Sequence, residues 1–289
     1  MINKNLLKTI GNTPVIELNR YSPNKKTKIY AKLENVNPSG SIKDRIALFM
    51  VNQAIKSKRL KPDLELIEPT SGNTGISLAM VSAILGYRFT AVMPENVSLE
   101  RRKFLQAYGA KIILTTEGQD ISLANKIVEE QPKKYLMLNQ FTNQNNVLAN
   151  YLNTGIEIVN QVPEITHFIA GIGTSGTLIG VSKRLKKYRQ KIQVIGLNPK
   201  YPTKIQGLRN LNFFQPLIFE KNFVDQIITI DEEESAFEYM KDLAKKLGLF
   251  VGISSGAALW GALKKSKEIR QGIIVTIFPD RGDRYLSLL

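Results

Sequence analysis

The sequence predicts an α/β protein with twisted, mostly parallel sheets that are flanked by helices. Short apolar runs alternate with stretches of helical spacing along the chain. Neighbouring parallel strands need a long crossover connection, usually a helix, so this alternation favours parallel sheets with helices on both faces. With 289 residues and 43% hydrophobic side chains, the chain is long enough for two compact lobes.

Each expected strand is a short apolar run, and helical patterns lie between most of them. The first helix is expected to follow Ser41 as its N-cap and to end in the Lys-rich stretch 56–61. The polar stretch 139–146 is the best candidate for a crossing between lobes. The expected strands are 29–33, 64–68, 89–93, 111–114, 135–138, 166–170, 193–197, 226–230 and 273–278.

The composition excludes several kinds of chemistry. The chain has no cysteine and a single histidine, His167, which excludes disulfides, thiolate catalysis and multi-histidine metal sites. We expect no bound metal. No apolar run approaches the ~20 residues of a membrane span. The first residues lack the pattern of a signal peptide, so we expect a cytoplasmic protein that does not enter a membrane.

The formal net charge of +15 raises the question of nucleic acid binding. Basic residues are spread from Lys4 to Arg284, and the one dense block, 183–191, has the pattern of a solvated helix end. No set of aromatic residues alternates with these charges to stack bases. We therefore expect no nucleic acid partner, although a positive field would attract small anionic substrates.

Lys43 is the first candidate for a catalytic residue. It lies in Ser39–Arg45, between a glycine turn and the first turn of the expected helix. Unpaired backbone N–H groups and the helix dipole disfavour an ammonium charge there and keep the amine nucleophilic. Such a lysine can form a Schiff base with a cofactor aldehyde. Taken alone, the segment also fits an ordinary solvated charge at a helix end.

The loop Thr70–Gly75 follows an expected strand and opens an apolar helix. Hydroxyls, an amide and backbone N–H groups converge at such a position, which predicts a pocket for a carboxylate. The alternative is a plain turn, because Ser, Thr and Asn are common helix caps.

The loop Gly171–Thr177 also joins a strand to a helix, and its glycines let the backbone close around a phosphate. It satisfies Gly-x-Gly-x-x-Gly, which is weak evidence for a dinucleotide. A nicotinamide site would need a carboxylate at the end of the next strand. Residues 196–200, which end that strand here, include no Asp or Glu. Lys200 leaves NADP open as an alternative.

A third motif, Gly252–Ala258, starts a helix with a serine pair. It fits either a capped helix start or a hydroxyl that faces a heterocyclic nitrogen. A serine does not hold a proton on a pyridine nitrogen as an aspartate would, which favours elimination over a long-lived carbanion.

Together these motifs resemble the cysteine synthases, the O-acetylserine sulfhydrylases among the fold type II (tryptophan synthase β-like) pyridoxal phosphate enzymes. The match runs in order along nearly the whole chain. The ending 280–287 and Gly207-Leu-Arg209 resemble the B isoform more than the A isoform. The motifs that carry the resemblance are 12–14, 37–45, 70–75, 140–141, 173–177 and 254–256.

The resemblance implies a smaller N-terminal α/β lobe, 35–144, and a larger one, 1–34 with 145–289. It implies pyridoxal 5'-phosphate in the interlobe cleft and a homodimer. Lys43 would be the Schiff-base lysine and the base that takes the α-proton, and Asn73 would contact the ring hydroxyl. The resemblance also implies that Ser254 faces the pyridine nitrogen and that Arg209 contacts an anionic sulfur donor. The cofactor phosphate would be bound by Gly173, Thr174, Ser175, Gly176 and Thr177. The substrate carboxylate would be bound by Thr70, Ser71, Thr74 and Gln140.

The implied activity is β-replacement, which forms L-cysteine from O-acetylserine and sulfide through an aminoacrylate. O-Phosphoserine or serine remain open as substrates, as in cystathionine synthases or dehydratases, and thiosulfate as sulfur donor. Gln144, Asn210 and Pro279 depart from residues common in the family, and the last two count against thiosulfate. Since the chain ends at Leu289, we expect no stable complex with serine acetyltransferase. The remote alternatives are an NADP-dependent oxidoreductase and a basic binding protein without activity.

Overall fold

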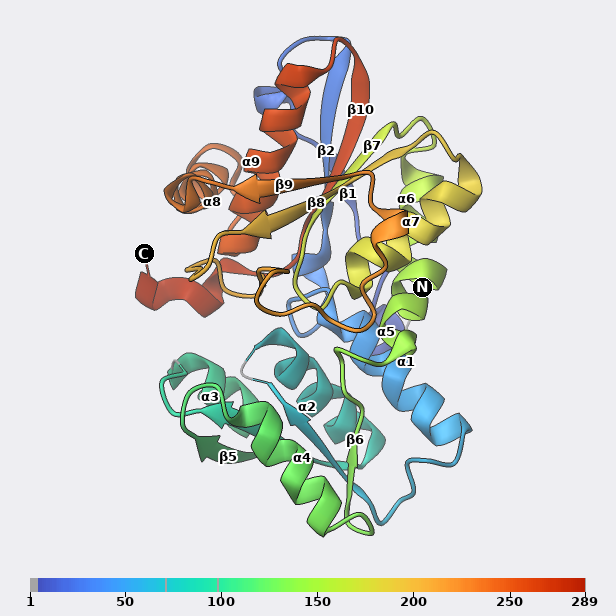
Figure 1. The fold of residues 1–289 in the computed structure, drawn as a ribbon, viewed down its shortest axis with the longest axis vertical. Coiled ribbons are helices and arrows are strands. Elements are labelled where there is room, and N and C mark those ends of the chain that lie inside the picture. Colours follow the sequence, from blue (N-terminus) through green and yellow to red (C-terminus); the bar gives the residue numbers. More distant parts are fainter. Residues whose placement is uncertain (1–4, 71, 98, 289) are drawn as a thin grey trace. The chain divides into compact units, whose positions relative to one another are not determined.

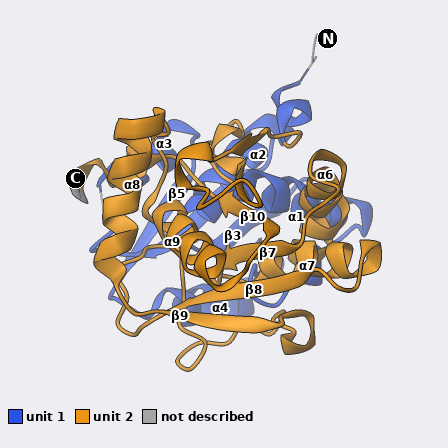
Figure 2. Ribbon diagram, turned by 90° about the horizontal axis from the view of Figure 1, so that it is seen from above, with its two compact units in different colours: residues 1–10, 43–145 blue, residues 11–42, 146–289 orange. Residues whose placement is uncertain are grey.

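The computed structural model describes residues 5–70, 72–97 and 99–288. The chain divides into two compact units, which Figure 2 shows in different colours. Unit 1 consists of residues 1–10 and 43–145, and unit 2 of residues 11–42 and 146–289. The chain passes between the units three times, and the last passage falls between Asn145 and Asn146, inside the polar stretch 139–146.

Unit 1 is built on a parallel sheet of four strands in the order β5-β4-β3-β6. All five residues of the central strand β3 are buried, which is why this stretch is a continuous apolar run apart from two glutamates. The strands are β3 (Glu65–Pro69), β4 (Arg88–Pro94), β5 (Lys111–Thr115) and β6 (Tyr135–Met137), and the helices are α1 (Lys43–Lys56), α2 (Asn73–Leu85), α3 (Leu99–Ala107) and α4 (Asp120–Glu130).

Unit 2 contains a sheet of six strands in the order β1-β2-β10-β7-β8-β9 (Figure 1). Only β1 is antiparallel to its neighbour. The strands are β1 (Val15–Glu17), β2 (Thr27–Leu33), β7 (His167–Gly171), β8 (Gln193–Pro199), β9 (Gln226–Ile230) and β10 (Gly272–Phe278).

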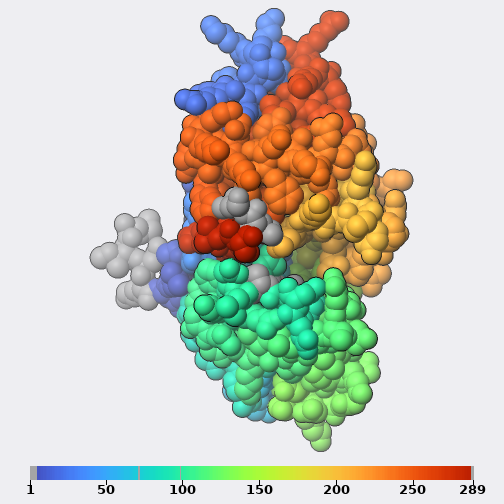
Figure 3. Space-filling model, turned by 90° about the vertical axis from the view of Figure 1, so that its left-hand side faces the viewer, coloured from blue at the N-terminus to red at the C-terminus, as the bar shows by residue number. Residues whose placement is uncertain are grey.

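Helices cover both faces of the unit 2 sheet. Along β7, Phe168 and Ala170 pack in one apolar cluster with α7, whereas Ile169 packs in the other with α8 and α9. Helix α8 contributes to the surface of unit 2 that faces the viewer in Figure 3 (orange). The helices are α5 (Gln144–Ala149), which continues through a π-helical turn (Asn150–Thr154) into α6 (Gly155–Gln161), and α7 (Gly176–Tyr188), α8 (Glu233–Leu247) and α9 (Ile253–Glu268).

Every strand expected from the sequence is present, within two residues at each end, and the α/β class is confirmed. The prediction missed β1, because three half-buried residues at a sheet edge form no apolar run. The first helix begins at Lys43, two residues after Ser41. In the described ranges, no helix is both long and apolar enough to cross a bilayer.

The units differ from the predicted lobes in two short segments and in one further residue, Asn145, which groups with unit 1. Residues 1–10 group with unit 1, and residues 35–42 group with unit 2. The second difference has a clear cause, because the C-terminal part of the chain binds this segment. The Ile42 N–H donates to the Pro279 carbonyl (2.9 Å), the Arg281 N–H donates to the Gly40 carbonyl (3.2 Å), and Arg284 Nη1 donates to the same carbonyl (3.0 Å).

Candidate active site

Lys43 is the first residue of α1, so it lies in the first helical turn as predicted, and it is half-buried. The next residue fixes this turn in unit 1. The fully buried Asp44 accepts a hydrogen bond from the Ser77 hydroxyl of α2 (2.6 Å). The N-terminal halves of α1 and α2 are therefore tied together, and Lys43 belongs to the same unit as the predicted carboxylate loop.

The carboxylate loop is ordered by its own side chains. Thr70 Oγ1 accepts hydrogen bonds from the N–H groups of Gly72 (3.4 Å) and Gly75 (3.2 Å), and helix α2 begins at Asn73. The Thr74 hydroxyl donates to Gln140 Oε1 (2.6 Å), and both residues are buried.

Four predicted residues, Thr70, Asn73, Thr74 and Gln140, thus gather around the N-terminus of α2, where N–H groups and the helix dipole favour an anion. The fifth, Ser71, lies outside the described residues.

A residue that sequence reasoning missed lies beside this cluster. Glu68 of β3 is fully buried and accepts hydrogen bonds from the N–H groups of Asn139 (3.0 Å) and Gln140 (2.8 Å). Burial raises the pKa of Glu68 to about 7, against the opposing effect of the N–H groups of Gln140, Asn139 and Leu138. The only signal in the sequence was an acidic residue within a buried apolar strand.

The glycine-rich loop of unit 2 joins β7 to α7. Ser175 immediately precedes α7 with a φ of +70°, and its side chain is only 3% exposed. Its buried Oγ makes no hydrogen bond with the residues that the structure describes. A buried hydroxyl at a helix N-terminus fits a phosphate oxygen as its partner.

Neighbouring segments hold this loop from two sides. A Cβ on Gly173 would overlap the Gly207 carbonyl oxygen, and one on Gly176 would overlap the Asn146 side chain. Asn146 donates from Nδ2 to Thr174 Oγ1 (3.1 Å), which also accepts from the Gly176 N–H (3.4 Å). The glycines are therefore required by close packing, and Asn146 is a supporting residue that the motif analysis did not include.

Arg209 is joined to the same loop through its backbone, because its N–H donates to the Ile172 carbonyl (2.8 Å). Its guanidinium lies over the Phe214 ring, 4.7 Å from the centroid. The adjacent Asn210 has a structural role. Its Nδ2 donates to the Pro199 carbonyl (2.6 Å), and its Oδ1 accepts from the Asn212 N–H (2.8 Å).

Ser254 lies in the first turn of α9 and is 8% exposed. The turn is fixed from its N-terminal side, since the Gly252 N–H donates to the Asp280 carbonyl (3.0 Å). The Asp280 carboxylate accepts from the Tyr285 hydroxyl (2.6 Å). Segment 279–285 therefore supports both the start of α9 and residues 39–42, which lead into Lys43.

The donor sets fit pyridoxal phosphate. Unit 1 offers an amine at a helix start and a carboxylate-binding loop, and unit 2 offers a phosphate loop with a buried hydroxyl and a serine for a ring nitrogen.

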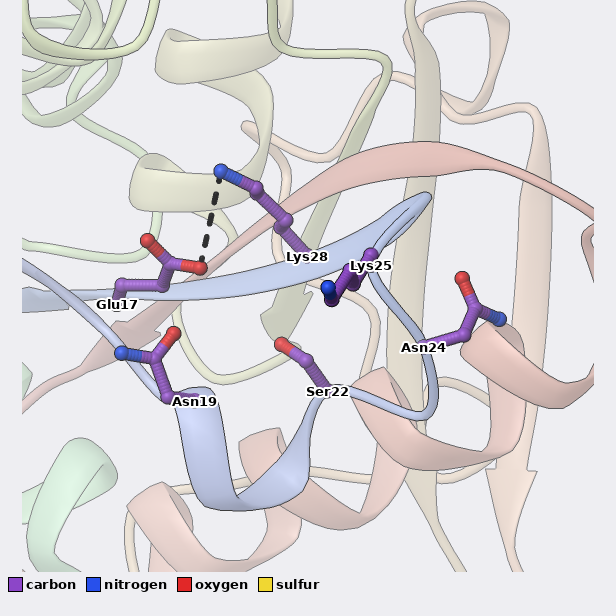
Figure 4. Close-up of a pocket in the computed structure, with 6 residues that line it drawn as sticks. All are labelled: Glu17, Asn19, Ser22, Asn24, Lys25 and Lys28. Carbon is purple, nitrogen blue, oxygen red and sulfur yellow. Dashed lines mark ion pairs between the residues drawn. The ribbon is translucent and has the colours of Figure 1, made fainter.

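A cavity of about 550 Å³ in unit 2 is separate from these residues (Figure 4). It is lined by side chains of the β1–β2 connection and by one residue of each strand, Glu17 of β1 and Lys28 of β2, whose Oε1 and Nζ form an ion pair of 3.9 Å. No predicted site residue lines it. The lining residues are Glu17, Asn19, Ser22, Asn24, Lys25 and Lys28.

The fold and these two sets of residues define a class of protein. The model of the family described as "Pyridoxal-phosphate dependent enzyme" matches residues 6–280, and the chain belongs to that family. This assignment bears out the pyridoxal phosphate interpretation, and it favours that interpretation over the two remote alternatives.

Three similar proteins narrow the class. The chain is 46% identical to the cysteine synthase of Aquifex aeolicus, over 98% of this chain and 90% of that protein. It is 42% identical to the cysteine synthase B of Escherichia coli, over 98% of this chain and 94% of that protein. The crystal structure of a cysteine synthase from Entamoeba histolytica superposes with a TM-score of 0.94 at 40% identity, covering 99% of this chain and 90% of that one.

Proposed function

We propose that this chain is a pyridoxal phosphate enzyme that forms L-cysteine from O-acetylserine and sulfide by β-replacement. The observation that carries the proposal is the pair of loops at helix N-termini, one with the polar groups for a carboxylate and one with the buried Ser175 hydroxyl for a phosphate. The full-length similarity to cysteine synthases supports the choice of reaction.

Each residue has a role in this proposal. The bound cofactor supplies an electron sink for the bonds at the substrate α-carbon. Lys43 would hold the cofactor through its amine, and the same amine, when it is not joined to the cofactor, would take the substrate α-proton and later return it. Lys43 lies in the first turn of α1, where unpaired N–H groups and the helix dipole disfavour an ammonium charge, and the Asp44–Ser77 hydrogen bond holds this turn against α2.

The remaining residues bind and orient. Asn73 contacts the ring hydroxyl of the cofactor, and residues 173–177 hold its phosphate. Ser254 would offer a neutral hydroxyl to the ring nitrogen, a partner that does not hold a proton there as an aspartate would. The substrate carboxylate is bound by Thr70, Ser71, Thr74 and Gln140, which leaves the β-carbon free for sulfide.

The substrates are tested by turnover. Purified protein loaded with pyridoxal phosphate is supplied with O-acetylserine, O-phosphoserine or serine, followed by sulfide or thiosulfate, and cysteine is measured. We expect O-acetylserine with sulfide to give the highest kcat/KM. Thiosulfate is expected to be poor, because Asn210 supplies no second cation beside Arg209. Preference for O-phosphoserine would revise the substrate, and no cysteine from any pair would contradict the function.

We propose further that the protein is a cytoplasmic homodimer without a nucleic acid, membrane or stable serine acetyltransferase partner.

An apolar stripe on α5, the π-helical turn and α6 is the face we assign to the dimer. Leu148 and Leu152 are each 40% exposed, and Ile156 and Val159 continue the stripe at helical spacing. Sedimentation should give twice the chain mass for the wild type and a shift towards monomer for Leu152→Glu. A monomeric wild type would overturn the proposal.

A further inference from the structure

The turn that carries Gln140 has an unusual backbone. It follows β6, and Asn139 adopts a φ of +55°, in the left-handed region that side chains other than glycine rarely occupy. Asn tolerates this region better than most residues, but the conformation still needs support from its surroundings. Two successive N–H groups, those of Asn139 and Gln140, point at one side chain, Glu68.

Glu68 meets both donors with separate oxygens. Oε2 accepts from Asn139 at 3.0 Å, and Oε1 accepts from Gln140 at 2.8 Å. An ionised carboxylate is an acceptor on both oxygens, whereas a protonated carboxyl or an amide presents a donor on one of them. The ionised form of Glu68 is therefore the form that matches this turn.

The connection continues from the turn to the substrate loop. The Gln140 side chain accepts the Thr74 hydroxyl through Oε1 (2.6 Å), and Thr74 lies in the first turn of α2. Glu68 thus fixes the backbone at Gln140, and Gln140 fixes Thr74. The turn has other bonds of its own, such as Asn143 Nδ2 to the Leu138 carbonyl (2.8 Å), so losing Glu68 should shift it rather than unfold it.

We propose that Glu68 is a positioning residue, which holds Gln140 and Thr74 in the geometry that binds the carboxylate of the amino-acid substrate. The inference rests on the proposed function of this loop as the substrate site. Glu68 acts through Gln140 and does not itself touch the substrate.

The titration of Glu68 makes the effect dependent on pH. With its pKa raised to about 7 by burial, the carboxyl is mostly protonated at pH 6 and mostly ionised at pH 8. No charged side chain contributes to this shift among the described residues; burial and the three N–H groups account for it. Affinity for an amino acid should therefore increase from pH 6 to pH 8 through this group.

The test compares the wild-type holoenzyme with Glu68→Gln. Binding of L-serine is followed by the shift of the visible cofactor band, which needs no turnover, and KM and kcat are measured with O-acetylserine. We expect the apparent Kd and KM to rise about tenfold, as for the loss of one hydrogen bond to a charged group, with kcat within about twofold. The part of the increase in affinity from pH 6 to pH 8 that Glu68 causes should disappear in the variant. The part that comes from deprotonation of the L-serine amine should remain in both proteins.

The control for the carboxylate is ethanolamine, which has the amine of L-serine without its carboxylate. Its band shift should need the same concentration in both proteins. Glu65→Gln is the matched control for burial, since Glu65 is also a buried carboxyl on β3 but accepts from the Thr90 hydroxyl. It should change stability and leave KM unchanged.

Two results would overturn the inference. One is an unchanged Kd for L-serine with the pH step intact in Glu68→Gln. The other is an equal loss of affinity for ethanolamine, which would indicate general damage. If O-acetylserine is not turned over by the wild type but the L-serine and ethanolamine results hold, the proposed reaction fails and the role of Glu68 stands.

Discussion

Replacing Lys43 with alanine is expected to lower kcat/KM for cysteine formation by at least about 10³-fold, because one amine supplies both the covalent link and the proton transfer. The phosphate loop belongs to unit 2 and is unchanged in this variant, so pyridoxal phosphate should still bind without a covalent link. The measurement is steady-state kinetics together with the visible spectrum of the loaded protein.

One further variant separates chemistry from charge at position 43, and another is a control at the far end of α1. Lys43→Arg keeps the positive charge, but its guanidinium cannot lose a proton, so activity should be as low as in the alanine variant. Lys56→Ala removes an exposed lysine from the other end of α1 and should retain full activity. Activity of Lys43→Ala within tenfold of the wild type would contradict the role assigned to Lys43.

Replacing Gly173 with alanine is expected to weaken pyridoxal phosphate binding by about 100-fold. The added Cβ would overlap the Gly207 carbonyl oxygen, which is backbone and cannot rotate away, so the loop or segment 207–209 must move. A phosphate held by this loop would lose several N–H contacts at once when the loop shifts. Equilibrium titration of the apoprotein with pyridoxal phosphate measures the loss.

Pyridoxal, which lacks the phosphate, shows whether the effect is specific. Its affinity should be nearly the same in the wild type and in Gly173→Ala. Gly180→Ala is the control for strain. Gly180 lies farther along α7, and a Cβ there would overlap the Val147 carbonyl oxygen of α5. It should reduce thermal stability while keeping the preference for the phosphorylated form. Equal losses for both cofactor forms in Gly173→Ala would refute a phosphate site in this loop.

The fold was predictable because its sheets are parallel and buried. Strands such as β3 and β8 are mostly apolar runs, and the helices that follow the glycine-rich loops start within the predicted segments. The weak element was β1, whose three residues form a strand only because β2 offers an edge.

The positions of most motif residues in the fold were predictable for a different reason, because these residues lie in local loops between a strand and a helix. The residues that support these loops were not predictable. Glu68 accepts hydrogen bonds from N–H groups more than 70 residues later in the chain, and Asn146 donates to a loop residue 28 positions later. Arg284 binds the Gly40 carbonyl across most of the chain. Such contacts depend on tertiary packing, and no local spacing indicates them.

The central claim is that Lys43 carries the cofactor. It is tested most directly by loading the protein with pyridoxal phosphate, reducing it with borohydride, digesting it and locating the modified lysine by mass spectrometry. The account predicts modification of the peptide that contains Lys43, and of no other lysine at stoichiometric yield. A stoichiometric label on a different lysine, or a loaded protein that acquires no label, would contradict it.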